Sequence, residues 1–232
     1  MPDAVRRYDG LLAAMDGRFR ALRERHPGAI ACGGGCADCC HGLFDVSLPD
    51  ARRLAQAYAA LPRAAQAAVA RRAARLQDAI REGLPGLAPP YFIEPCRDGE
   101  VDALVEALTG ARCPFLGDGG GSRDLCLVYA DRPLACRLEG LPMVDSDGGL
   151  FDDWCERNFA DALPPEVMRE LRLDYCAMQE VEQEAALQLL ARLRAAGGGR
   201  GDAPTVLIPS VVAAFEGFWL PALARLADPG AP

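Results

Sequence analysis

The segment ACGGGCADCCHG at residues 31–42 places four cysteines within nine residues, at Cys32, Cys36, Cys39 and Cys40. On one straight helix these side chains would share a face, but the first and last would lie about 12 Å apart along the axis. The sulfur ligands of one tetrahedral zinc ion lie only about 4 Å from one another. A straight helix therefore cannot bring all four thiols to one ion, and the segment has to fold back on itself.

The three glycines after the first cysteine supply the necessary freedom, because glycine adopts positive φ without steric strain. We expect them to fold Cys32 back over the later cysteines, which would lie on the first turn of a helix, where free N–H groups favour thiolate. Adjacent Cys39 and Cys40 would point in different directions. Either one of the two is not a ligand, or the pair serves two metal ions or a polynuclear cluster, and the polynuclear alternative is slightly favoured.

The rest of the composition limits what these thiols can do. The net charge of −8 argues against a nucleic-acid partner, and no apolar run approaches the roughly 20 residues that cross a bilayer. The N-terminal segment is amphipathic and lacks the apolar centre of a signal peptide. We therefore expect a cytoplasmic protein with no membrane partner. In a reducing compartment, its 10 cysteines indicate metal binding or catalysis rather than structural disulfides.

Apolar periodicity and turn residues predict mainly helical structure. We expect helices at residues 3–26, 47–60, 62–82, 101–108, 164–196 and 210–226. Ser47 and Asp50 resemble a capping box for the second helix, and Pro221 would kink the last. Residues 84–163 are rich in Gly, Pro and Asp and contain one β-like stretch at 125–129.

The predicted fold class is mainly α, a single domain of residues 1–232 with little β structure. A helical shell would surround an irregular, cysteine-rich metal-binding centre at about residues 30–158. The C-terminal helices would occupy about residues 164–228. Because an irregular segment as long as residues 84–163 is unusual in a compact domain, a bound metal would help to organise this segment.

The middle segment supplies further thiols in the motifs CPFL (113–116), CLVY (126–129) and DRPLACR (131–137). Arg132 and Arg137 flank these thiols. We expect the two guanidinium groups to contact the bound cofactor by donating hydrogen bonds to sulfur and offsetting thiolate charge. Surface salt bridges are the alternative role for both.

The ordered set CGGGCADCC, CPFL, CLVYADRPLACR and Trp154-Cys155 resembles the YkgJ-type cysteine-cluster family, also called CxxCxxCC, which is described as a zinc- or iron-chelating domain. The similarity spans roughly residues 30–158, although three residues rather than two separate Cys32 from Cys36. The resemblance implies that the metal ligands are Cys32, Cys36, Cys39, Cys40, Cys113, Cys126, Cys136 and Cys155. His41 is an alternative nitrogen ligand, Cys176 is expected to be buried in a helix, and Cys96 has no assigned role.

Three functions fit this reading. The first is iron binding, with an iron–sulfur cluster as one form. It includes a cluster-dependent modification enzyme similar to flagellin lysine-N-methylases, which carry a similar cysteine cluster. The second is a zinc-stabilised protein-interaction module, and the third is metal storage or delivery. Thiolates bind zinc, copper(I) and iron alike, so the ligands alone leave the metal, the substrate and any protein partner open.

Overall fold

The computed structural model describes residues 3–93, 99–117, 125–144, 148–151, 155–159, 165–166, 169, 172–194 and 204–226. Its helices are α1 (Asp3–Arg25), α2 (Leu48–Ala60), α3 (Arg63–Gly83), α4 (Glu100–Ala107), α5 (Leu134–Leu138), α7 (Tyr175–Arg194), α8 (Ile208–Ala213) and α9 (Leu220–Leu226). Its strands are β1 (Asp45–Ser47), β2 (Leu116–Gly117), β3 (Leu125–Cys126), β4 (Met143–Val144), β5 (Leu150–Phe151), β6 (Leu173–Asp174) and β7 (Thr205–Leu207). Short 3-10 turns lie at Asp38–Cys40 and Tyr129–Asp131.

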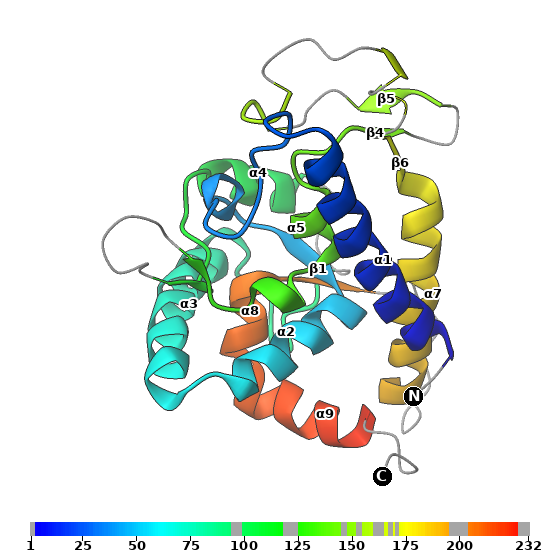
Figure 1. Ribbon diagram of the computed structural model, residues 1–232. Helices are drawn as coiled ribbons and strands as arrows, with labels where there is room; N and C mark the ends of the chain where they lie inside the picture. The colour runs from blue at the N-terminus through cyan, green and yellow to red at the C-terminus, as the bar shows by residue number, and fades with distance from the viewer. Residues whose placement is uncertain are drawn as a thin grey trace.

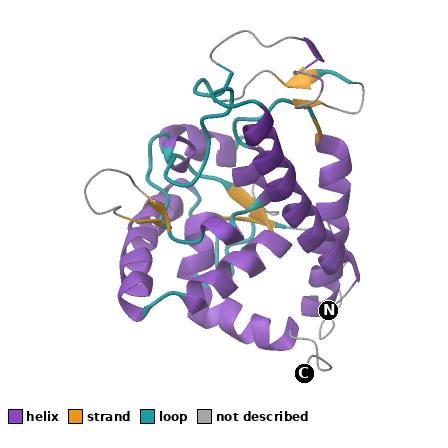
Figure 2. Cartoon of the chain, viewed as in Figure 1, coloured by secondary structure: helices purple, strands orange, loops and turns teal. Residues whose placement is uncertain are grey.

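The mainly α fold class is confirmed. Helix α1 packs along α7, α3 packs against α8, and α2 contacts both α7 and α8 (Figure 1). The strands are short and lie between or beside the helices (Figure 2). Among the described residues, no helix combines the length and the apolar character needed to cross a membrane.

The described strands form three small sheets. Strand β1 pairs antiparallel with β7, with Asp45 opposite Leu207. Strands β2 and β3 pair antiparallel, with Leu116 opposite Cys126. Strand β4 lies between β5, which is antiparallel to it, and β6, which is parallel. The β2–β3 pair is the one that matters for the thiols, because it fixes the second cysteine motif beside the third.

One hydrophobic cluster runs through the described helices. The alternating spacing of three and four residues in α1 correctly predicted a buried face, which consists of Val5, Tyr8, Leu12, Met15 and Leu22. These side chains pack into the same cluster as residues of α2, α3, α7, α8 and α9, and as the fully buried Trp219 between α8 and α9. The helices therefore form a common frame on which the irregular segments are mounted.

Two predicted helices differ from the structure. The helix expected at 164–196 is interrupted: residues 165, 166 and 169 are helical, strand β6 follows at Leu173–Asp174, and α7 begins at Tyr175. Residues 167, 168, 170 and 171 of the expected helix lie outside the described residues. The last helix is interrupted by a π-helical turn at Phe215–Trp219, directly before Pro221. Because proline has no backbone N–H, it breaks the regular hydrogen-bond pattern of a helix, and a π turn is a local change in that pattern.

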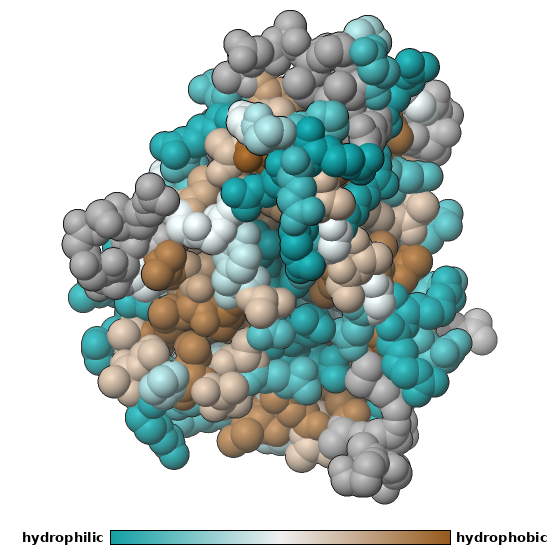
Figure 3. Space-filling view, viewed as in Figure 1, coloured by the Kyte–Doolittle hydropathy of each residue, from teal (hydrophilic) through white to brown (hydrophobic). Residues whose placement is uncertain are grey.

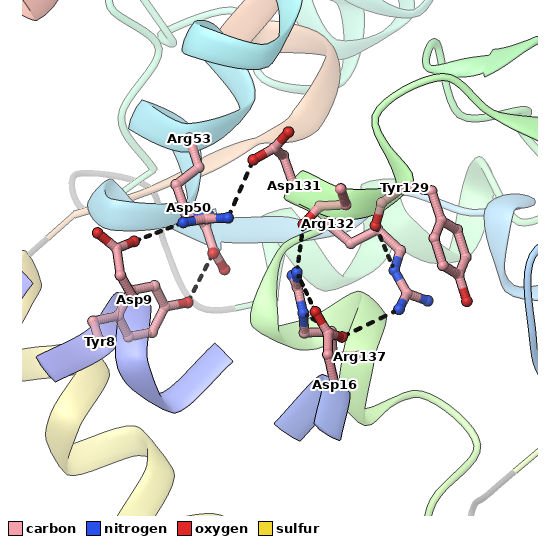
Figure 4. Close-up of polar contacts among 10 residues, drawn as sticks. Tyr8, Asp9, Asp16, Asp50, Arg53, Tyr129, Asp131, Arg132 and Arg137 are labelled. Carbon is pink, nitrogen blue, oxygen red and sulfur yellow. Dashed lines mark hydrogen bonds and ion pairs between the residues drawn. The ribbon is translucent and has the colours of Figure 1, made fainter. Parts of the chain in front are cut away.

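The predicted capping box is wrong in its contacts, although Ser47 does occupy the N-cap position of α2. Its hydroxyl donates instead to Glu182 of α7, at 2.7 Å. Asp50 is 1% exposed and accepts hydrogen bonds from the Tyr8 hydroxyl, at 2.7 Å, and from the backbone N–H of Leu134, at 2.8 Å. Figure 4 shows the first of these contacts. The start of α2 therefore joins three other helices rather than capping itself.

Candidate metal centre

Seven of the predicted ligands line a single cavity of about 80 Å³, namely Cys32, Cys36, Cys39, Cys40, Cys113, Cys126 and Cys136. The cavity lies between the C-terminal half of α1, the loop that contains the first four cysteines, and the segment from 113 to 141. A single water molecule needs roughly 10–15 Å³ by this measure, so the space holds several atoms of that size. Thiols separated by more than a hundred residues in the chain thus meet in one place.

Backbone hydrogen bonds bring the first two cysteine motifs together. The N–H of Cys113 donates to the carbonyl of Cys40, at 2.8 Å, and His41 forms a β-bridge with Arg112. Gly35 has φ of +95°, as the glycine run predicted, and Cys36 closes a turn by donating its N–H to Gly33. The β2–β3 pair then sets Cys126 beside the Cys113 motif.

Helix α5 carries Cys136, and the buried carboxylate of Asp50 fixes its N-terminus. Leu134 is the first residue of α5, and its N–H would otherwise have no intrahelical partner. Asp50 accepts this hydrogen bond, so α2 positions α5 and with it the Cys136 thiol. Burial raises the pKa of Asp50 to about 7, whereas the hydrogen bonds from Tyr8 and Leu134 act to lower it.

Cys155 lies next to Cys32 rather than on the cavity wall, and Asn158 holds this corner of the structure. The Asn158 side chain is 1% exposed. Its Oδ1 accepts from the N–H groups of Ala31 and Cys32, at 2.9 and 3.3 Å. Its Nδ2 donates to the carbonyl of Gly140, at 2.6 Å, and to the Cys32 sulfur, at 3.2 Å.

Gly140 is required at this corner on two grounds. Its φ is +80°, and a Cβ there would lie 2.7 Å from Asn158 Nδ2 and 2.9 Å from Cys155 Cβ. It would also lie 3.3 Å from the Cys32 sulfur. The close approach of Cys32 and Cys155 therefore depends on the absence of a side chain at position 140.

Burial and nearby thiols raise the pKa of five cysteines when no cation is bound, namely Cys32, Cys39, Cys113, Cys126 and Cys136. Burial raises the pKa of Cys32 to about 11, against the opposing hydrogen bond from Asn158. Burial likewise raises the pKa of Cys113 to about 12 and that of Cys136 well above its ordinary value. For Cys39, the hydrogen bond to the neighbouring Cys40 thiol raises the pKa most, followed by burial.

The Cys39–Cys40 contact differs from the expectation that adjacent thiols diverge. Both residues lie in the 3-10 turn Asp38–Cys40, and both line the cavity. Neither thiol is therefore turned away from the other cysteines.

The nine described cysteines are all free thiols. Among the described residues, no three Cys, His, Asp or Glu side chains are spaced to hold one metal ion. The sulfurs thus line the wall of the cavity and do not converge on one point. Rotation about χ1 moves a cysteine sulfur between staggered positions while the backbone stays in place.

Arg132 and Arg137 line the same cavity, but they donate hydrogen bonds to oxygen atoms rather than to sulfur. Asp16 of α1 lies between the two guanidinium groups (Figure 4). Arg137 donates to Asp16 through Nε and Nη2, at 3.1 and 3.2 Å, and to the carbonyl of Ala130, at 2.8 Å. Arg132 donates to the carbonyl of Tyr129, at 3.0 Å, and lies 3.6 Å from Asp16.

One buried nitrogen atom of Arg137 has no hydrogen-bond acceptor. The Arg137 side chain is 3% exposed, and its Nη1 is buried with no hydrogen-bond partner. A buried cationic donor without an acceptor is unfavourable, so an acceptor inside the cavity would stabilise it. Arg132 acts on the thiols through its charge, which lowers the pKa of Cys126 against the larger effect of burial.

The remaining predicted residues lie elsewhere. Cys176 is half-buried in α7 and lines a different cavity with Glu182 and Tyr175. His41 is exposed, and its Nδ1 lies 3.0 Å from the carbonyl oxygen of Ala37. Cys96 and Trp154 are outside the described residues.

Sequence reasoning missed Asn158 and Asp16. Asn158 follows Cys155 by three residues with no motif around it, and Asp16 looks like one more polar residue of an amphipathic helix. Only the tertiary packing reveals their contacts: Asp16 lines the cavity from α1, and Asn158 contacts Cys32 and Gly140.

The geometry is that of a helical frame around a cavity lined by seven thiols, which are soft metal ligands. The comparison with family models agrees. Residues 31–156, more than half of the 232-residue chain, match the family CxxCxxCC, described as "Putative zinc- or iron-chelating domain". The chain belongs to this family, which confirms zinc or iron as the expected metal. Neither the curated proteins nor the solved structures that were searched gave a significant match.

Proposed function

We propose that the chain binds iron or zinc in a multinuclear thiolate centre, with an iron–sulfur cluster as one form. The observation that carries this proposal is the meeting of seven cysteines on one cavity. A single tetrahedral site uses four protein ligands, so seven thiols exceed the need of one ion. Cys155 lies next to Cys32 and would supply an eighth sulfur.

The bound metal would replace the thiol protons as the partner of sulfur. Because burial keeps the thiols protonated in the metal-free protein, metal binding releases protons and neutralises the buried sulfur charge. Arg132 and the unsatisfied Nη1 of Arg137 offset the remaining negative charge on the sulfurs. A thiolate centre of this kind also favours a reducing, cytoplasmic location.

A second candidate function, a structural zinc centre in a protein-interaction module, is favoured by the irregularity of the middle segment. Among the described residues between 84 and 159, the longest helix is α4, with eight residues. Metal–sulfur bonds would then take the place of secondary structure in holding this segment together.

Anaerobic purification distinguishes the two. Absorbance between about 300 and 600 nm together with acid-labile sulfide indicates an iron–sulfur cluster, since thiolate-bound iron is coloured and zinc has no d–d transitions. A colourless protein with two or more zinc ions per chain supports the multinuclear zinc form. A colourless protein with one zinc ion supports the structural module. A folded protein that binds neither metal overturns both.

Cysteine variants test the ligand assignment. Cys36→Ser and Cys136→Ser each remove a thiol from the cavity wall and are expected to lower the metal content per chain. Cys176→Ser is the matched control, because this thiol lies on a different cavity and its loss leaves the metal content unchanged. Equal metal loss in all three variants would contradict the assignment.

A further inference from the structure

A second cavity adjoins the thiol cavity and differs from it in chemistry. It has a volume of about 540 Å³ and lies between the C-terminal half of α1 and the turn at Tyr129–Arg132. Asp16, Phe19, Tyr129 and Arg132 line both cavities, so these side chains form a wall that the larger cavity shares with the thiol cavity. Its size falls in the range of roughly 300–1,000 Å³ that is typical of small-molecule sites.

The charge of this region is opposite to that of the chain. Overall the protein has 33 acidic and 25 basic residues. The two cavities together reverse the ratio, with five arginines (Arg18, Arg20, Arg23, Arg132, Arg137) and three acidic residues (Asp16, Glu24, Glu139). Figure 3 shows the hydrophilic surface over this part of α1. A local excess of cations in an acidic protein attracts anions.

The arginines come from opposite walls of the larger cavity. Arg20 and Arg23 lie one turn apart on α1, whereas Arg132 belongs to the facing turn and stacks on the Tyr129 ring, 3.7 Å from its centre. The Arg23 guanidinium lies close over the backbone of Gly33, where a Cβ would be only 2.6 Å from Nη1. Guanidinium groups bind carboxylate and phosphate by paired hydrogen bonds.

Asp16 neutralises part of this charge from within the protein. It is 36% exposed and lies 3.6 Å from Arg132 while it pairs with Arg137. The Asp16 carboxylate therefore competes with any bound anion for the guanidinium groups. Replacing Asp16 by the uncharged asparagine should therefore strengthen anion binding, whereas replacing the arginines should weaken it.

We propose that the cavity between α1 and the 129–132 turn binds a small molecule through its carboxylate or phosphate group, and that Arg132 places this molecule beside the thiol centre. The binding depends on arginine side chains and does not require the metal. The failure of this proposal and that of the metal proposal are therefore measured separately.

Titration calorimetry at low ionic strength tests it, with inorganic phosphate and succinate as the two probes and the metal content measured for every preparation. Saturable binding of either probe is expected, and the tighter probe identifies the acidic group. Arg23→Gln and Arg20→Gln should each weaken binding by roughly fivefold, with the metal content unchanged. Asp16→Asn should strengthen it by roughly threefold or more, because a competing negative charge is lost.

The matched control is Arg81→Gln, which removes an exposed arginine from α3 that pairs with Asp78. Its binding should equal that of the unmodified chain. The proposal is overturned if neither probe binds saturably or if Arg23→Gln and Arg20→Gln bind as well as the parent. It is also overturned if Arg81→Gln loses as much affinity as they do, since the effect would then be one of net charge. Both arginines are exposed, so these variants should retain the fold.

Discussion

Replacing Asn158 by alanine should destabilise the protein far more than the loss of one exposed amide side chain would. The substitution removes four hydrogen bonds, to the N–H groups of Ala31 and Cys32, the Gly140 carbonyl and the Cys32 sulfur. Ala31 is exposed, so water can replace its partner. Gly140 is buried, and its carbonyl would lose the 2.6 Å hydrogen bond without replacement.

An unsatisfied buried carbonyl costs about 1–3 kcal/mol, and the lost bond to the Cys32 amide adds about 1 kcal/mol. The free energy of unfolding should therefore fall by about 2–4 kcal/mol. For a chain of this size the melting temperature would drop by roughly 4–16 °C. Urea unfolding followed by circular dichroism, on metal-free protein, measures this loss without a contribution from metal binding.

Asn158→Asp sharpens the test. The carboxylate keeps an acceptor for Ala31 and Cys32 but places negative charge against the Gly140 carbonyl and the Cys32 sulfur. The loss at neutral pH should equal or exceed that of Asn158→Ala and should shrink in acid, where the carboxyl is protonated.

The control is Gln179→Ala, which removes an exposed amide that donates to the Tyr175 hydroxyl, and which should change stability by less than about 0.5 kcal/mol. A loss below about 1 kcal/mol for Asn158→Ala, or an equal loss for the control, would refute the reasoning.

Four further predictions concern Gly140, Gly10, Asp50 and the metal affinity. Gly140→Ala should cost roughly 1–3 kcal/mol and lower the metal content, because a Cβ clashes with Asn158 at φ +80°. Gly10→Ala, on an open face of α1, should stabilise by roughly 0.5–1 kcal/mol in the same unfolding assay. The pKa of Asp50 rises from 3.8 to about 7 on folding, so the folded state binds the extra proton and stability falls as pH rises between these values. The free energy of unfolding should change with pH by at most about 1.4 kcal/mol per pH unit from this group. Asp50→Asn should reduce this slope when urea unfolding is measured at about pH 4.5, 6 and 7.5. An unchanged slope in the variant would contradict the prediction. Metal affinity, measured by competition with a chelator, should rise with pH through the neutral range, because binding displaces protons from thiols whose pKa burial has raised; a pH-independent affinity would contradict this.

The local spacing of apolar residues was sufficient to predict most of the helices, because this spacing indicates which face of a helix is buried. It placed α1, α2, α3 and α4 within a few residues of their observed bounds. It failed where the decisive contact was distant. Ser47 and Asp50 have the spacing of a capping box, but a buried carboxylate takes its partners from whichever helices surround it, here α1 and α5.

The sequence alone determined the chemistry of the centre, since cysteine is a soft ligand wherever it occurs and the ordered motifs define the family. Tertiary structure decided which thiols share a cavity, that Cys176 lies apart from them, and that Asn158 and Asp16 support the site. Spacing along a chain constrains side chains only within a few residues of one another. The meeting of Cys32, Cys113 and Cys136 depends on how the helices pack, and that packing is a property of the whole hydrophobic core.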